Sequence, residues 1–407
     1  MIEEGERMEI ICEKEHCTGC TACAVSCPKN AISMKENDKG FIYPYIDKEA
    51  CMDCGLCKNV CPQLAIKEKV RPNVRKVYAA FTKDLDIRNN SSSGGMFTEL
   101  ARSILQEGGV VFASRMSDNC HELYFDKCER VEDLDKFRGS KYLQSHPRSV
   151  FLEIKKELEL EKMVLFIGTA CQVAGLKSFL KKKYDKLFTV DIICHGVPSP
   201  KLWSDYMKQL EQLYCSSAKK VNFRYKKPSW TEFSLCIEFE NGREFLKSKF
   251  DDPYLISFLK EIALRDNCYT CPYTNIERVG DITLADFWGY KSTDFKMRNT
   301  EKGISLVLIN SDNGTTLFKK IVSRILFTEK RLKDAVDGNR SLKEPWSRNP
   351  LADEFWSEYL KGAGLQSAFK KYCKPYRFPL KMKINWFALN HLYLVPRFIL
   401  RKKGLIK

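Results

Sequence analysis

Two cysteine runs near the start of the chain restrict most strongly what it can fold into. "CTGCTACAVSCP" and "CMDCGLCKNVCP" share the spacing C-x-x-C-x-x-C-x-x-x-C-P. Two-residue gaps let three thiolates surround one iron–sulfur cubane, and the fourth, followed by proline, reaches the neighbouring cluster. The predicted ligands are Cys17, Cys20, Cys23 and Cys61 for one 4Fe–4S cluster, and Cys51, Cys54, Cys57 and Cys27 for the other. A pair of zinc sites is the alternative, although zinc favours isolated sets of four ligands.

The runs predict that residues 1–70 form an α+β ferredoxin-like two-cluster module of the bacterial type. The length of 407 residues favours two or three domains. The chain has 18 cysteines, and its opening "MIEEGERMEI" lacks the apolar segment of a signal peptide. We therefore expect a reducing, cytoplasmic setting, in which cysteines usually serve metal binding or catalysis.

Strand and helix patterns alternate after the module. Apolar strands are predicted at 76–82, 109–114, 163–168 and 187–194, and amphipathic helices at 96–108, 150–162 and 173–184. This order predicts an α/β domain with a largely parallel sheet. Further on, "FSLCIEFENGREFLKS" alternates around an Asn-Gly turn, as a β-hairpin does. We expect 220–310 to be added β structure packed on the sheet.

Four further cysteines suggest a third metal site. Cys171 and Cys194 each follow a predicted core strand, and ligands gather beyond the carboxyl ends of parallel strands. Cys268 and Cys271 add a C-x-x-C pair. The four favour a third 4Fe–4S cluster, with a zinc site of the same ligands, unrelated buried thiols or a Cys171–His195 nucleophile pair as alternatives. The six other cysteines, Cys12 among them, lack partner spacing and are expected to be ordinary thiols.

The stretch "NNSSSGGMF" (89–97) leads into a predicted helix. Two glycines let backbone come close to a ligand, and a helix N-terminus attracts phosphate. A plain serine-capped helix is the alternative. No G-x-G-x-x-G follows a strand, so an ordinary dinucleotide fingerprint is unsupported.

Several motifs occur in a fixed order: "SSSGG", "GSKYLQS", "GTACQ", "DIICHGVPSP", and C-x-x-C followed by "DITLADFWG". In these motifs, over about 1–310, the chain resembles the beta-subunit family of coenzyme F-420 hydrogenase/dehydrogenase, preceded by a ferredoxin module. It departs from the family at Ala170, where proline is frequent, and at Ala285, where glycine is common. The resemblance implies a flavin, usually FAD and less often FMN, beside a 4Fe–4S cluster, and a domain over 71–350.

The resemblance also assigns residues by position. "SSSGG" implies that Ser92, Ser93, Gly94 and Gly95 contact the flavin phosphates or ribityl chain, and "GSKY" implies that Ser140 and Lys141 lie near its ring. Lys141 is a candidate catalytic residue, because a fixed cation favours a negatively charged flavin, with a solvated lysine as the alternative. His195, next to Cys194, is a candidate proton donor or a structural imidazole. Asp286 and Trp288 either shape the site or form a buried turn.

Charge is concentrated at the end of the chain. The net charge is +16, and after Glu358 there are twelve Lys or Arg and no acidic residue. Residues 351–407 are therefore expected to form a basic, aromatic extension. Its last part, 381–407, suggests contact with an anionic membrane surface, with packing on the protein itself or partner docking as alternatives. No nucleic-acid motif accompanies the charge, so nucleic acid is not expected.

These features favour an oxidoreductase that passes electrons from a ferredoxin-type donor through 4Fe–4S clusters and a flavin to an unidentified small-molecule or membrane-linked substrate. An electron-transfer subunit of a larger hydrogenase or dehydrogenase is the second hypothesis. A non-catalytic partner-binding protein that keeps its clusters for structure is the third. The expected localisation is cytoplasmic, with a peripheral position at the inner membrane face as an extension of that hypothesis.

Overall fold

The computed structural model describes residues 10–64, 74–291, 297 and 301–376. The predicted membrane-contact segment 381–407 lies outside these residues. Within the described ranges, no helix combines the length and the apolar character needed to cross a bilayer.

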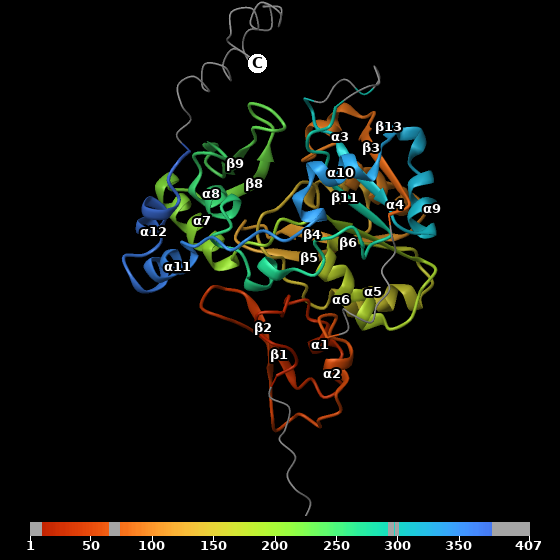
Figure 1. The fold of residues 1–407 in the computed structure, drawn as a ribbon, viewed down its shortest axis with the longest axis horizontal. Coiled ribbons are helices and arrows are strands. Elements are labelled where there is room, and N and C mark those ends of the chain that lie inside the picture. Colours follow the sequence, from red (N-terminus) through yellow and green to blue (C-terminus); the bar gives the residue numbers. More distant parts are fainter. Residues whose placement is uncertain (1–9, 65–73, 292–296, 298–300, 377–407) are drawn as a thin grey trace, which may run out of the picture.

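An eight-stranded sheet forms the centre of the large domain (Figure 1). Its spatial order is β13-β3-β12-β11-β7-β6-β4-β5. The strands are β3 (Lys76–Thr82), β4 (Val110–Met116), β5 (Leu123–Cys128), β6 (Val164–Thr169), β7 (Leu187–Ile192), β11 (Ile282–Asp286), β12 (Ser305–Ile309) and β13 (Ile325–Glu329). The strands and helices expected between 76 and 194 are present, with shifted ends.

The sheet is mixed, which corrects the expected largely parallel arrangement. Its centre, β4-β6-β7-β11, is parallel. The alternation of strands and helices predicts β4, β6 and β7, whereas β11 comes from 220–310, which was expected to be added β structure and instead contributes a central strand. Both flanks are antiparallel: β5 pairs with β4, and β3 lies between β12 and β13. The first predicted strand therefore pairs with strands more than 200 residues later (Ser305 opposite Ala80, Ile325 opposite Thr82), which its local pattern does not reveal.

Helices cover both faces of this sheet (Figure 1). One core places Leu100 and Ile104 of α4 against Val111 and Leu165 of the sheet, and another places Phe151 and Val173 against its other side. The helices of this part are α3 (Leu85–Asn89), α4 (Met96–Gln106), α5 (Val150–Glu159), α6 (Ala170–Leu180), α9 (Asp312–Lys319) and α10 (Leu332–Gly338).

A second lobe, green and blue in Figure 1, lies beside the sheet. A three-stranded antiparallel sheet, β10-β9-β8, includes the predicted hairpin. Its members are β8 (Ala218–Tyr225), β9 (Ser234–Phe239) and β10 (Glu244–Ser248), with helices α7 (Pro200–Tyr214), α8 (Pro253–Leu259), α11 (Ala352–Lys361) and α12 (Leu365–Tyr372). Phe355 and Phe369 share a core with Trp203 and Tyr254, so 352–373 packs within this lobe. The domain boundary expected at 350 stays a prediction.

The N-terminal module contains α1 (Ala22–Val25), β1 (Ile32–Glu36), β2 (Ile42–Ile46) and α2 (Leu56–Asn59). β1 and β2 form an antiparallel pair. Cys20, Ala22 and Val60 belong to the same hydrophobic core as Phe151 and Val173 of the large domain. The module is thus docked beneath α5 and α6 through a shared apolar core (Figure 1).

Candidate iron–sulfur and cofactor site

Two small cavities in the module collect the cysteines of the two runs. One is lined by Cys17, Cys20, Cys23 and Cys61, and the other by Cys27, Cys51, Cys54 and Cys57. Each cavity therefore combines three cysteines of one run with the last cysteine of the other. Helices α1 and α2 each begin after a residue of positive φ, Thr21 and Gly55, which turns the chain between ligands. Four thiols around one cavity are a donor set that fits a 4Fe–4S cluster.

Cys12, expected to be an ordinary thiol, lines the first of these cavities. Hydrogen bonds with Cys17 and Cys61 raise the pKa of Cys12 and lower the pKa of Cys17 to about 6 and that of Cys61 to about 7. Four residues stand between Cys12 and Cys17, which leaves Cys12 outside the C-x-x-C-x-x-C-x-x-x-C run from which the ligands were predicted. The expectation for Cys12 was incomplete, because only the folded loop brings its thiol to the cavity.

A third cavity is lined by the predicted third set, Cys171, Cys194, Cys268 and Cys271. Cys171 lies in the first turn of α6, just after β6, and Cys194 follows β7. Burial raises the pKa of Cys171, and burial with the neighbouring Cys171 and Cys271 raises the pKa of Cys194 to about 12. The thiolates that iron requires would therefore form as the metal displaces their protons.

The described residues include no group of three Cys, His, Asp or Glu side chains close enough to hold a single metal ion. A cubane cluster offers a different geometry, since each cysteine binds a separate iron and the ligands surround the cluster. The thiols line cavities in that way.

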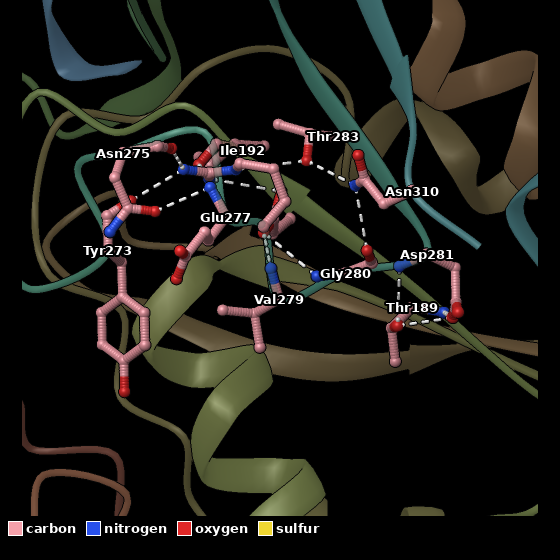
Figure 2. A network of polar contacts seen from close by, with 12 residues as sticks. Thr189, Ile192, Tyr273, Asn275, Glu277, Val279, Gly280, Asp281, Thr283 and Asn310 are labelled. Carbon is pink, nitrogen blue, oxygen red and sulfur yellow. Dashed lines mark hydrogen bonds and ion pairs between the residues drawn. The ribbon is translucent and has the colours of Figure 1, made fainter. Parts of the chain in front are cut away.

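A polar network joins residues 273–283, which follow Cys268 and Cys271 in the chain, to the end of β7 (Figure 2). Arg278 donates to the carbonyls of Tyr273 and Asn275 at 2.7 and 3.1 Å, and lies 3.4 Å from Asp191 of β7. Asp191 also accepts from the backbone N–H groups of Val279 and Gly280 at 3.0 and 3.1 Å. Buried charged groups with this many partners hold one geometry, so the network holds the segment that follows Cys271 against the end of β7.

A much larger cavity of about 770 Å³ adjoins the third one. The two cavities have a common wall made by Thr169, Gln172, Ile192, Cys194, His195, Gly196, Val197 and Ser341. The volume is within the range of cofactor pockets. A group bound in the large cavity would thus lie next to the third set of cysteines.

The "SSSGG" loop and the "GSKY" segment meet at this large cavity. Ser92, Ser93, Gly95, Ser140 and Lys141 line it, and the backbone N–H of Ser140 donates to Ser92 Oγ at 2.6 Å. Gly94 is absent from the lining. A Cβ at position 94 would lie 2.4 Å from the backbone oxygen of Ala80, so this glycine permits close packing on β3.

Two observations fit an anionic group at this loop. No side chain caps the N-terminus of α4, whose N-cap is Gly95 with φ +87°. The hydroxyl of Ser93 is buried and has no hydrogen-bond partner within the described structure. Uncapped N–H groups and an unsatisfied hydroxyl are suited to phosphate oxygens.

Lys141 and His195 both line the large cavity. Lys141 Nζ donates to the carbonyls of Phe137, Arg138 and Gly139 at 2.8, 3.2 and 3.1 Å. Burial lowers the pKa of Lys141 to about 7, so its charge is sensitive to a ligand at neutral pH.

His195 is held between two aromatic rings, with centroid distances of 4.8 Å to Phe258 and 4.5 Å to Trp346. Its Nε2 lies 3.1 Å from Glu261 Oε1, although the two atoms are not aligned as a hydrogen bond. The ring lies in the common wall of the two cavities.

Arg224, which no sequence motif singles out, lines the large cavity and is 4% exposed. Its Nη1 donates to Asp286 Oδ2 at 2.9 Å and to Tyr142 Oη at 3.2 Å. Trp230 Nε1 donates to the other oxygen of Asp286 at 2.8 Å. Burial opposes the charge of Arg224, but the Asp286 carboxylate raises its pKa above the ordinary value. Asp286 is thus the last residue of β11 and a part of the cavity wall.

Glycine 175 allows the module to approach α6. A Cβ at this position would lie 2.8 Å from Cys20 Cβ and 3.0 Å from Cys20 Sγ. Gly→Ala in a helix interior usually stabilises by about 1 kcal/mol. We predict the opposite sign here: Gly175→Ala should destabilise by about 1–3 kcal/mol, because overpacking displaces a predicted ligand. Urea unfolding and iron content of the anaerobic protein check this, and an unchanged or increased stability would contradict it.

The comparisons with known proteins agree with this architecture. Two family models for the beta subunit of coenzyme F420 hydrogenase/dehydrogenase match the chain, the N-terminal one over residues 77–151 and the C-terminal one over residues 161–335. Residues 16–65 match a 4Fe-4S dicluster domain. An uncharacterized protein of Methanocaldococcus jannaschii is 26% identical over 355 residues, covering 77% of this chain and 89% of that protein.

Among solved structures, the F420-reducing [NiFe] hydrogenase complex from Methanosarcina barkeri, in a xenon-derivatized form, contains a similar chain. The identity is 19%, the TM-score is 0.45, and the match covers 70% of this chain and 98% of that one.

Fold and domain content define an iron–sulfur electron-transfer protein of an oxidoreductase class. The chain belongs to the coenzyme F420 hydrogenase/dehydrogenase beta-subunit family, with a 4Fe-4S dicluster domain at its N-terminus. The resemblance found in the sequence motifs is thereby confirmed.

Proposed function

We propose that this chain is a flavin- and iron–sulfur-dependent oxidoreductase that takes electrons from a ferredoxin-type donor and delivers them to a small-molecule substrate. The observation that carries the proposal is the common wall between the third cysteine cavity and the large cavity, which includes Cys194 and His195. A cysteine set that fits a cluster therefore lies beside a pocket large enough for a cofactor and part of a substrate.

The order of the cavities supports a direction of transfer. Cys54, in the cavity of the second run, is exposed to solvent, whereas Cys17 and Cys20 are buried. Thr18 lines both the Cys17 cavity and the third cavity. Electrons from an external donor would therefore enter at the exposed set, pass the buried set and reach the third set beside the large cavity.

The residues of the large cavity fit a flavin, for which FAD is the better candidate because the space of about 770 Å³ suits a dinucleotide. Ser92, Ser93 and the N-terminus of α4 would hold its phosphates, and Ser140 and Lys141 would lie closer to its ring. When bound, a flavin supplies the conversion between single-electron and two-electron transfer. Lys141 would hold a positive charge near it, and His195 would hold or donate a proton at Nε2.

The flavin assignment predicts opposite effects of one substitution on stability and on binding. Ser93→Ala removes a buried hydroxyl that has no partner in the described structure, so the flavin-free protein should keep or slightly increase its stability. FAD affinity should fall about tenfold, because one hydrogen bond of roughly 1–1.5 kcal/mol is lost. Fluorescence titration of deflavinated protein with FAD measures this, with Ser103→Ala on the far part of α4 as the control. Equal FAD affinity in Ser93→Ala and the wild-type protein would show that Ser93 does not contact the flavin.

Reduction kinetics test the function as a whole. In anaerobic wild-type protein, a reduced ferredoxin-type donor should reduce both the clusters and the bound flavin. In Cys171→Ala the N-terminal clusters should still be reduced, while flavin reduction should slow by at least about 100-fold, because single-electron transfer then lacks its last carrier. Stopped-flow absorbance separates the two signals. Rapid flavin reduction in Cys171→Ala would refute the proposed route.

An electron-transfer subunit is the second candidate, because the family description names a beta subunit of a hydrogenase or dehydrogenase. Substrate turnover by the purified single chain, supplied only with reduced donor, separates the two. Turnover supports a self-sufficient reductase. Reduction of the flavin without turnover, restored by an added subunit, supports the second candidate.

A further inference from the structure

Arg265 is a fully buried guanidinium at the junction between the N-terminal module and the large domain, with an exposed fraction of 0%. Its Nε donates to the backbone oxygen of Cys17 at 2.9 Å, and its Nη2 to that of Ile42 at 2.9 Å. Its Nη1 donates to Gln144 Oε1 at 3.0 Å. The guanidinium also lies over the ring of Tyr43, 4.2 Å from its centroid. One side chain of the large domain thus holds the loop that carries Cys17 by hydrogen bonds.

The hydrogen-bond partners do not neutralise the charge of Arg265, because all three acceptors are neutral carbonyl oxygens. A buried charge is costly unless an opposite charge compensates it. Arg278, on the loop of the third cavity, has such compensation from Asp191 at 3.4 Å. The two buried arginines near the cysteine sets therefore differ in how their charge is balanced.

The two cysteine sets lie on either side of Arg265. On the module side it donates to the backbone oxygen of Cys17, and on the large-domain side it donates to Gln144, which lines the third cavity. Gln144 links the same two sides, since its Nε2 donates to the backbone oxygen of Thr18 at 3.0 Å and Thr18 lines both cavities. Negative charge on both cysteine sets would compensate the guanidinium.

The module provides room for this arrangement at Gly19, whose φ is +68°. A Cβ there would lie 3.0 Å from Gln144 Nε2 and 3.2 Å from Arg265 Nη1. The loop between Cys17 and Cys20 therefore approaches the guanidinium closely because position 19 carries no side chain.

We propose that Arg265 raises the reduction potentials of the two clusters on either side of it, the one held by the Cys17 set and the one held by the Cys171 set, and so favours passage of an electron inward from the exposed cluster of the Cys54 set to these two clusters. This inference rests on the proposed function. The exposed cluster is oxidised by one electron as the cluster of the Cys17 set is reduced by one, and the fixed positive charge stabilises the negative charge added to the clusters beside Arg265. The cluster of the exposed Cys54 set, which Arg265 does not contact, should be affected least.

Redox titration of the anaerobic full-length protein, followed by electron paramagnetic resonance, tests the proposal. In Arg265→Gln, the ratio of reduced to oxidised cluster at a fixed ambient potential should fall about tenfold for the two adjacent clusters, which is about 59 mV for a one-electron couple. Arg265→Lys keeps a positive charge, so its ratio of reduced to oxidised cluster should stay within about threefold of the wild-type ratio. The exposed cluster should also stay within that range.

Gln144 offers a second route that leaves Arg265 in place. Gln144→Glu puts a carboxylate of nearly the same shape against the guanidinium, so it should lower the two potentials as Arg265→Gln does, even if the latter variant fails to fold. Gln144→Met breaks the same hydrogen bonds without adding charge and is the matched control, with no expected shift of potential. Limited proteolysis reports any loosening of the module in each variant.

Equal shifts in Arg265→Gln and Arg265→Lys, or in Gln144→Glu and Gln144→Met, would assign the effect to loosened packing and overturn the proposal. An equal shift of the exposed cluster would do the same. If the wild-type protein contains three clusters and no variant changes their reduction potentials, only the role of Arg265 is overturned. Wild-type protein without clusters would overturn the proposed function together with it.

Discussion

Anaerobically purified protein is expected to contain about twelve iron atoms per chain, because three sets of four cysteines each fit one 4Fe–4S cluster. Cys171→Ala should lower this to about eight and remove one spectroscopic component. The N-terminal clusters should persist, since none of their cavities is lined by Cys171. Metal analysis with electron paramagnetic resonance measures both effects.

Cys236→Ala is the matched control for this loss. Cys236 is a buried thiol on β9, in the second lobe, and lines none of the three cysteine cavities. Its replacement should leave the iron content unchanged. Near-stoichiometric zinc together with eight irons in the wild-type protein would show that the third set holds zinc, the alternative that the same four ligands leave open.

Removal of the carboxylate beside Arg224 is expected to cost about 3–5 kcal/mol of unfolding free energy, because a charge in the wall of the large cavity would lose its counter-ion. Asp286→Ala is the variant, measured by urea unfolding under anaerobic conditions. Asp286→Asn keeps a hydrogen-bond acceptor for Trp230 and should destabilise less. The comparison separates the loss of charge from the loss of the hydrogen bonds.

An exposed ion pair supplies the control for Asp286→Ala. Asp353 pairs with Arg348, and their side chains are 75% and 36% exposed. Solvent screens such a pair, so Asp353→Ala should cost about 1 kcal/mol or less. Equal losses of unfolding free energy in Asp286→Ala and Asp353→Ala would show that the buried pair stabilises the protein no more than the exposed pair does.

The sequence by itself determined the family and the placement of the cysteine runs. Gaps of two and three residues are local properties, and they group Cys51, Cys54 and Cys57 without any knowledge of the fold. The alternation of apolar strands and amphipathic helices also predicted the parallel strands β4, β6 and β7, because a strand and its neighbouring helix are specified by a local stretch of chain. β11 joins β7 from about 90 residues later, and the alternation did not predict this pairing. The motif order predicted the family that the comparisons confirm.

Only the tertiary structure decided what depends on distant parts of the chain. β3 pairs with β12 and β13, which made the sheet mixed, and Cys12, which lies outside the two cysteine runs, lines the cavity of Cys17. Arg224 meets Asp286 across 62 residues, and Arg265 meets Cys17 across 248. Such contacts leave no periodic pattern in the sequence. They form when separate hydrophobic faces pack against one another, and this packing brings distant polar groups together.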